Sequence, residues 1–252
     1  MRKLFVPGLI VLLLSSCVTE KVFKPRDPER AAELNAELGL GYMRQGQYKR
    51  AMGKLEKAIE YDSENIKALH YKAELHRRLG QQDKAGEYFS EAIERAPKNQ
   101  LLLNNYGVYL CGVKRYDEAI DIFKKSLEDP LYESKARVYE NIGLCRLWQG
   151  KINQSESAFH QALAINPNMS TSLLELAKVR FDQGNKREAY SFYNRYIGLA
   201  LHTPESLWLG ILIEHGRGAK NTVASYKVKL KGRFPDSKET KLLKKFESQG
   251  KL

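Results

Sequence analysis

The 252-residue sequence repeats a pattern of small and large residues about every 34 residues. The second copy shows the pattern most clearly, in the order small, small, aromatic, small, proline: Gly80, Ala85, Phe89, Ala92 and Pro97. Matching residues recur in the other copies at Gly46, Ala51, Ala58, Gly107, Ala119, Phe123, Gly143, Gly150, Phe159, Ala162, Pro167, Gly184, Ala189 and Tyr193. A period of roughly 20–50 residues is typical of arrays of stacked units. We therefore expect a scaffold that binds other molecules rather than an enzyme.

Each repeat carries the signals of two α-helices. Apolar residues recur at spacings of three and four, as in Ala119, Ile120, Phe123 and Leu127. Four first helices are predicted to end at a glycine, which adopts a left-handed backbone without a clash: Gly46, Gly80, Gly150 and Gly184. No useful stretch alternates with a period of two, so we expect no strands. The spacing resembles the tetratricopeptide repeat and predicts an all-α, right-handed superhelical solenoid of about six helix-turn-helix repeats.

The repeat phase divides the chain into six units and a tail. The units are placed at 32–65, 66–99, 100–133, 136–169, 170–203 and 204–237. Ser134 and Lys135 are additional residues between the third and fourth units. The sixth unit is degenerate because Lys227 stands where an aromatic residue is expected, and a terminal repeat needs a more polar face. Residues 238–252 are predicted to be a basic C-terminal tail that contains a short helix.

The N-terminus has the features of a lipoprotein precursor. Residues 1–16 begin with Arg2 and Lys3 and continue as an apolar run, which predicts a signal peptide. The sequence Leu14-Ser15-Ser16-Cys17 matches the bacterial lipoprotein box, so we expect lipid on Cys17. Val18 favours the outer membrane, since inner-membrane lipoproteins usually have Asp there. Residues 17–31 would then form the lipidated anchor and tether. The alternative is an ordinary signal peptide cut near Cys17.

Charge and cysteine content bear on partners and compartment. Without residues 1–16 the chain has 40 basic and 30 acidic residues, a net charge of +10. A periplasmic protein does not meet nucleic acid, so acidic protein surfaces or anionic lipid are the favoured partners. Cys111 and Cys145 form an even pair for an oxidising compartment, and neighbouring first helices would bring them within reach of a disulfide. The alternative is two small buried thiols.

No pattern of residues indicates chemistry. His70 and His76 are six residues apart, which does not fit the helical spacing of a zinc site. There is no phosphate-binding loop and no serine elbow, and the carboxylates are spread along helix faces. We therefore expect no catalytic residues, no metal, no cofactor and no small-molecule substrate.

A binding surface is predicted where first helices line the concave side of such a solenoid. Its N-terminal half is polar and basic, with Lys67, Arg77 and Arg78. Its C-terminal half is apolar and aromatic, and the predicted partner-binding groove consists of Asn104, Val108, Leu144, Trp148, Leu174, Phe181 and Trp208. Tryptophan is a favoured hot-spot residue in interfaces. The alternative is that Trp148 and Trp208 pack within the solenoid.

The sequence resembles the type IV pilus biogenesis and stability lipoproteins, the PilF/PilW-type secretin pilotins, over essentially its whole length. The segments that carry the resemblance are 104–107, 115–119, 129–132, 140–143 and 206–210. The resemblance implies an outer-membrane lipoprotein, facing the periplasm, that binds the type IV pilus secretin and aids its localisation or assembly and pilus stability. Two alternatives remain: an adaptor for cell-wall enzymes, and an accessory of outer-membrane protein assembly.

Overall fold

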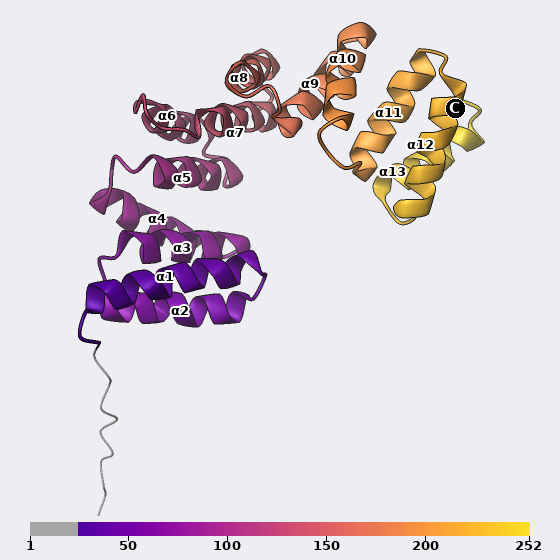
Figure 1. Cartoon of the computed structure of the whole chain (residues 1–252). Helices are drawn as coiled ribbons and strands as arrows, with labels where there is room; N and C mark the ends of the chain where they lie inside the picture. The colour runs from indigo at the N-terminus through magenta and orange to yellow at the C-terminus, as the bar shows by residue number, and fades with distance from the viewer. Residues whose placement is uncertain (1–24) are drawn as a thin grey trace, which may run out of the picture.

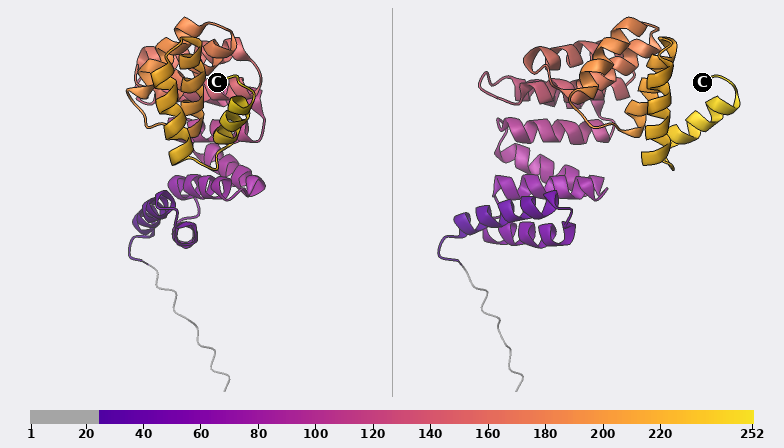
Figure 2. Two further views of the ribbon diagram at one scale, coloured as in Figure 1. Left: turned by 90° about the vertical axis from the view of Figure 1, so that its right-hand side faces the viewer. Right: turned by 45° about the vertical axis from the view of Figure 1, so that its right-hand side comes forward.

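The computed structural model describes residues 25–252, which form thirteen α-helices and no strand. The helices are α1 (Pro28–Arg44), α2 (Tyr48–Tyr61), α3 (Ile66–Arg78), α4 (Gln82–Arg95), α5 (Gln100–Gly112), α6 (Tyr116–Leu127), α7 (Lys135–Trp148), α8 (Ile152–Ile165), α9 (Ser170–Asp182), α10 (Lys186–Ile197), α11 (Pro204–Gly216), α12 (Lys220–Arg233) and α13 (Lys238–Ser248). Each odd-numbered helix up to α11 pairs with the helix that follows it, and the six pairs stack into an arch (Figures 1 and 2). The predicted all-α solenoid is confirmed.

The repeat phase locates most of the first helices. Helices α3, α5, α9 and α11 begin at the residues where the period places the starts of their units. Helix α7 begins at Lys135, one residue before the expected Ala136. Helix α1 instead begins at Pro28, inside the segment 17–31 that was predicted to be a tether, so that boundary was wrong. The physical reason is a local start signal: the Asp27 carboxylate accepts a hydrogen bond of 2.8 Å from the backbone N–H of Arg30, and Pro28 occupies the first turn.

A residue in the left-handed backbone conformation follows each first helix of the six units. Gly46, Gly80, Gly150 and Gly184 all have positive φ angles, as predicted, and Gly218 does the same after α11. The third unit differs, because Lys114 occupies this place with a φ of 65°. A residue with a Cβ atom is strained in this conformation. The turn geometry is therefore set by the repeat and not by glycine alone.

The core lies between the two helices of each unit, where one large side chain fills a recurring position. Leu55, Phe89, Phe123, Phe159 and Tyr193 occupy this position in the first five units, and all are fully buried. In the sixth unit Tyr226, one residue before the expected place, is buried against Tyr193. The sixth unit is therefore less degenerate than predicted from Lys227, because its aromatic residue is shifted by one position.

Helix α13 continues the stack. It begins 34 residues after α11 and packs against both α11 and α12, as the first helix of a further unit would. Its Leu243 and Thr240 are buried, and the Thr240 hydroxyl donates to the Phe234 carbonyl at 2.7 Å. The C-terminal tail is therefore an integral part of the solenoid that covers its last unit.

Candidate partner-binding surface

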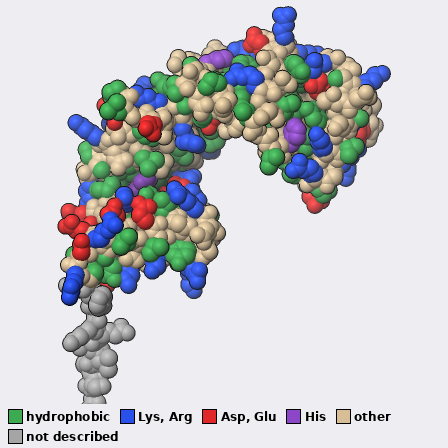
Figure 3. All heavy atoms as spheres, in the orientation of Figure 1, with side chains coloured by type: hydrophobic (Ala, Val, Ile, Leu, Met, Phe, Trp, Pro, Cys, Tyr) green, Lys and Arg blue, Asp and Glu red, His purple; other side chains and the backbone are tan. Residues whose placement is uncertain are grey.

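The concave surface of the arch is lined by first helices. In Figure 1, α7, α9 and α11 lie toward the open side of the arch, while α8 and α10 lie on its outer side. Hydrophobic side chains are visible along the arch in the space-filling view (Figure 3). The predicted groove residues all lie on first helices, at positions 104, 108, 144, 148, 174, 181 and 208 of α5, α7, α9 and α11. Their accessibility decides which of them a partner can reach.

The predicted groove residues fall into three groups. Trp148 is 57% exposed at the end of α7, so its side chain is available to a partner. Val108, Leu144, Phe181 and Trp208 are half-buried.

Asn104 and Leu174 are only 3% and 8% exposed, so they offer almost no surface to a partner. For these two residues the helical position was right but the expected accessibility was wrong.

Asn104 belongs to a hydrogen-bonded ladder that joins three first helices. Asn141 Nδ2 on α7 donates to Asn104 Oδ1 at 2.9 Å, and Asn104 Nδ2 donates to Asn105 Oδ1 at 3.3 Å. Asn105 Nδ2 in turn donates to His70 Nε2 on α3 at 2.8 Å. Burial lowers the pKa of His70 from 6.5 to about 4, so the ring is neutral and its Nε2 can accept this bond. The buried Asn104 amide and His70 imidazole thus have hydrogen-bond partners, and the ladder fixes the spacing of α3, α5 and α7.

The polar N-terminal half of the concave surface pairs its own charges. Lys67 Nζ lies 2.8 Å from a Glu33 oxygen and 3.0 Å from a Glu37 oxygen. Arg77 and Arg78 both bond Glu74, with N–O distances of 2.7 and 2.9 Å.

These pairings also show in the carboxylate pKa. Burial alone would raise the pKa of Glu74, but the hydrogen bonds from Arg77 and Arg78 bring it below its usual value. Lys67, Arg77 and Arg78 are therefore neutralised within the protein.

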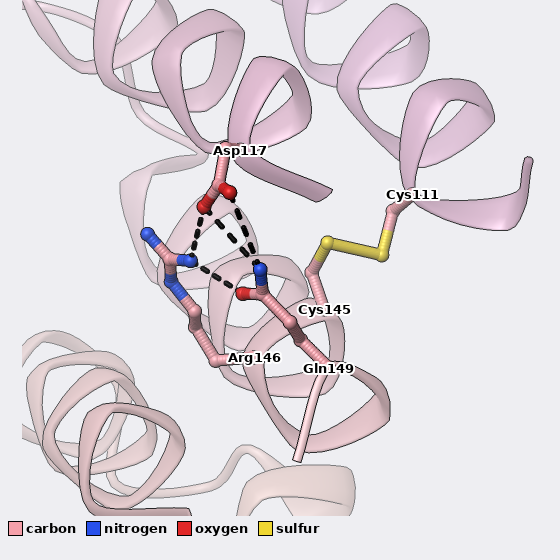
Figure 4. Close-up of a disulfide and its surroundings, with 5 residues drawn as sticks. All are labelled: Cys111, Asp117, Cys145, Arg146 and Gln149. Carbon is pink, nitrogen blue, oxygen red and sulfur yellow. Dashed lines mark hydrogen bonds and ion pairs between the residues drawn. A yellow bond between two sulfur atoms is a disulfide. The ribbon is translucent and has the colours of Figure 1, made fainter. Parts of the chain in front are cut away.

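The last turn of α7, which carries Trp148, is held from two sides (Figure 4). A disulfide joins Cys145 to Cys111 of α5, with a Cα–Cα distance of 5.7 Å, as predicted. On the other side, Arg146 Nη1 donates to Asp117 Oδ1 at 2.8 Å, and Gln149 Nε2 donates to the same oxygen at 3.3 Å. The hydrogen bond from Arg146 is the main cause of the lowered pKa of Asp117.

Sequence reasoning missed this cluster of Asp117, Arg146 and Gln149. The available signal was Asp117 in the first turn of a second helix, within a segment that carries the family resemblance. The result is a tryptophan presented on a rigid turn, which lowers the entropic cost of binding through it.

Trp208 is contacted by the tail helix. Its ring lies edge-on to Phe246 of α13, with ring centroids 5.2 Å apart. Part of the predicted groove is therefore covered by the chain itself, and for Trp208 the alternative of packing within the solenoid describes the structure better.

Residues 25–252 have neither a metal-binding cluster nor a membrane-spanning helix. No group of three or more His, Cys, Asp and Glu side chains in this part of the chain is placed to hold a metal ion. None of the helices in this part combines the length and the hydropathy needed to cross a bilayer. The signal peptide 1–16 and the lipidation residue Cys17 lie outside the described residues.

Comparison with known proteins relates this geometry to pilus assembly. Residues 44–126 match the family model of anaphase-promoting complex, cyclosome, subunit 3, and residues 141–200 match that of the tetratricopeptide repeat. The type IV pilus assembly protein PilF of Pseudomonas aeruginosa is 32% identical over 237 residues, which cover 92% of this chain and 93% of that protein. The chain belongs to the PilF family of type IV pilus assembly proteins.

Solved structures agree with the PilF assignment. The structure of Pseudomonas aeruginosa PilF has a TM-score of 0.79 at 30% identity and covers 86% of this chain and 98% of its own. PilW, described as a widely conserved type IV pilus biogenesis factor, has a TM-score of 0.76 at 29% identity, with coverage of 84% and 97%. The chain is thus a tetratricopeptide scaffold of pilus assembly and not an enzyme, and proteins of this class act by binding other proteins.

Proposed function

We propose that this protein is an outer-membrane lipoprotein, anchored through Cys17 on the periplasmic side, that binds the type IV pilus secretin and aids its localisation or assembly. The family relationship supports a role in pilus assembly. The lipoprotein box at 14–17 and Val18 support the anchor and the membrane. The disulfide between Cys111 and Cys145 agrees with an oxidising compartment such as the periplasm.

The partner-binding site is the apolar surface around the end of α7. The observation that carries this assignment is Trp148, a large aromatic side chain that is 57% exposed on a turn held by a disulfide and by Asp117. Leu144, one helical turn before it, is half-buried on the same helix, and Phe181 occupies a groove position in the next unit. A surface of this kind suits a helix or extended segment with apolar anchors. Lys67, Arg77 and Arg78 are already paired within the protein, which disfavours an acidic partner at these residues.

Replacement of Trp148 tests the site. Trp148→Ala is expected to weaken secretin binding by about thirtyfold, or about 2 kcal/mol, because a hot-spot tryptophan typically contributes that much. Its free energy of unfolding should change little, because the side chain is exposed. Trp208→Ala is the matched control, and should lower stability through the lost contact with Phe246. Normal secretin binding by folded Trp148→Ala would place the partner elsewhere on the molecule.

Replacement of Cys17 tests the anchor. We expect Cys17→Ser to leave a soluble or signal-retaining protein whose repeats still fold, because lipid and not the solenoid holds it at the membrane. Membrane fractionation measures this, with secretin multimers assayed in the same cells. Detergent-dependent release of the variant from the outer membrane would contradict lipidation. If secretin multimers form normally after deletion of the gene, the protein is instead a scaffold for other partners, such as cell-wall enzymes or outer-membrane proteins.

A further inference from the structure

The positive charge of the chain is concentrated at its C-terminal end. Residues 217–252 contain 11 Lys and Arg residues and 3 Asp and Glu residues, a net charge of +8 out of +12 for the whole sequence. These residues comprise the α11–α12 connection, helices α12 and α13, and the short segments that follow each of the two helices. In Figure 3 Lys and Arg side chains gather over the lower part of this end of the arch.

Most of this charge is not neutralised by the fold. Glu247 pairs with Lys231 at 2.7 Å and with Lys227 at 3.4 Å. The four lysines of α13 are exposed and form no ion pair with any residue that the structure describes, and we call them the C-terminal basic surface: Lys238, Lys241, Lys244 and Lys245. On α12, Lys220, Lys229 and Arg233 are also exposed and form no ion pair with a described residue. This contrasts with Lys67, Arg77 and Arg78 of the concave surface, which are all paired.

Helix α13 separates its apolar and basic faces. Lys238, Lys241 and Lys245 follow a spacing of three and four residues, which places them on one side of the helix. Thr240 and Leu243 are buried on the opposite side. The lysines are therefore held at the outer surface of a folded element.

We propose that the C-terminal basic surface binds an anionic phospholipid bilayer. Two observations favour a bilayer over an acidic protein. The surface is lysine-rich, and a lysine ammonium is a point charge that suits a diffuse layer of phosphates, whereas specific recognition of carboxylates favours the planar fork of arginine. In addition, the neighbouring helix α12 carries Val228, an apolar side chain that is 71% exposed. Clusters of four to eight basic residues on an amphipathic helix bind anionic membranes at about 1 kcal/mol per residue.

The position of α13 in the arch can be compared with that of the N-terminal helix, which the proposed anchor would hold near a bilayer. The start of α1 and the turn between α12 and α13 both lie on the lower side of the arch in Figure 1, and the views in Figure 2 keep them there. A bilayer that holds the N-terminal end through the proposed anchor would therefore face the basic surface too. This proposal rests on the proposed function only for which bilayer the surface meets. The charge and exposure of α13 do not depend on that function.

Vesicle flotation tests the proposal with the chain from residue 18 onward, which lacks Cys17 and contains every described helix. This protein is expected to float with vesicles of phosphatidylcholine mixed with phosphatidylglycerol, but not with phosphatidylcholine alone, and to dissociate as salt screens the charges. The variant Lys238→Gln/Lys241→Gln/Lys244→Gln/Lys245→Gln should bind several hundredfold more weakly, since each lysine contributes about fivefold. Circular dichroism verifies that it remains folded.

The matched control removes the same charge elsewhere. Lys49, Lys84, Lys98 and Lys125 are exposed and unpaired among the described residues, and the Lys→Gln variant at these four positions should bind anionic vesicles like the parent. Equal loss in both variants would mean that only net charge matters, and would overturn the proposal. Equal flotation with both kinds of vesicle would also overturn the proposal. Binding of polyglutamate without binding of vesicles would do the same. Because the tested chain has no anchor, a failure of lipidation or secretin binding would leave this result unchanged.

Discussion

Single residues show where the repeat imposes a conformation on the sequence. Lys114 has a φ of 65° at the place where, in each of the five remaining units, a glycine follows the first helix. Its backbone N–H donates to the Cys111 carbonyl at 3.0 Å, so the turn closes as it does elsewhere. A left-handed residue with a Cβ atom costs about 1–2 kcal/mol, partly offset because glycine loses more entropy on folding. The third unit therefore tolerates a local strain.

Lys114→Gly is expected to raise the free energy of unfolding by about 0.5–1 kcal/mol, because relief of the left-handed strain exceeds the added entropy of the unfolded chain. Urea unfolding measures the change. Gly80→Ala is the converse control: it places a Cβ atom at a φ of 74° and should lower stability by about 1 kcal/mol. If the Lys114→Gly variant were less stable than the parent, the conclusion that Lys114 is strained would be wrong.

His70 should make stability depend on pH. Its folded pKa of about 4 lies below its ordinary value of 6.5, so between these values the unfolded chain binds a proton that the folded chain does not. The contribution of His70 is fully present above pH 6.5 and is lost as pH falls toward 4. The loss is about 3 kcal/mol at most, from 1.36 kcal/mol per pKa unit.

Comparison with His70→Gln isolates this contribution, since the carboxylates titrate in both proteins. The free energy of unfolding of the parent should fall more steeply from neutral pH to about pH 4 than that of the variant. Parallel pH profiles would show that His70 is not the titrating group.

At the scale of helices, close approach depends on positions without a side chain. A Cβ atom on Gly107 of α5 would lie 2.6 Å from the Phe123 ring of α6, and one on Gly143 of α7 would meet the Phe159 ring of α8 in the same way. Both rings are fully buried and have no space to move away. These glycines therefore set the distance between the two helices of a unit.

Gly107→Ala should destabilise the protein by about 1–3 kcal/mol, the usual cost of overpacking a filled core. Gly53→Ala is the matched control, because Gly53 lies in the middle of α2 with open space around its Cβ position. It should gain about 1 kcal/mol from better helix propensity. Thermal unfolding of the two variants gives the comparison, and equal effects would mean that helix propensity outweighs packing at Gly107.

Helices also show how far sequence reasoning reaches. The period places the starts of α3, α5, α9 and α11, because every unit must repeat the same contacts with its neighbours. It misses Pro28, because the start of α1 is set by the Asp27 cap and not by the repeat. It also left α13 as a tail, although Lys238 follows Pro204 by one period.

The candidate site was predicted less well than the helices. Position in the repeat identifies the helix face, but Asn104 is buried by a ladder of amides and Leu174 by packing in the core. Trp148 stays exposed because it lies at the end of its helix. Such differences depend on neighbouring units, which the pattern of a single repeat does not describe.

For the whole molecule, the disulfide joins the two halves of the arch. Each unit of a solenoid contacts only its neighbours, so stability adds up locally and weak junctions can open. The junction of the third and fourth units contains the inserted residues, and Cys111–Cys145 links the first helices on either side of it. The two halves therefore remain tethered across the least regular step of the array.

Reduction of this disulfide should lower the free energy of unfolding by about 2–4 kcal/mol, the usual effect of opening a loop of about 34 residues. Denaturant unfolding with and without reductant measures the loss. The double variant Cys111→Ala/Cys145→Ala supplies the control and should not respond to reductant. Two free thiols in unreduced protein from the periplasm would show that the bridge does not form there.

The two ends of the stack differ, and this limits how copies can associate. In α3 and α5, Ala68 and Leu102 are covered by the preceding unit, whereas the equivalent Leu34 of α1 is 51% exposed because no described unit precedes it. The outer face of α13 carries lysines instead. Head-to-tail addition of copies would place these lysines in contact with Leu34 and Leu38. The lysine ammonium groups would then lose their hydration without gaining an ion-pair or hydrogen-bond partner, which costs free energy. Open-ended filaments are thus disfavoured, although each 34-residue unit is built to stack on the next.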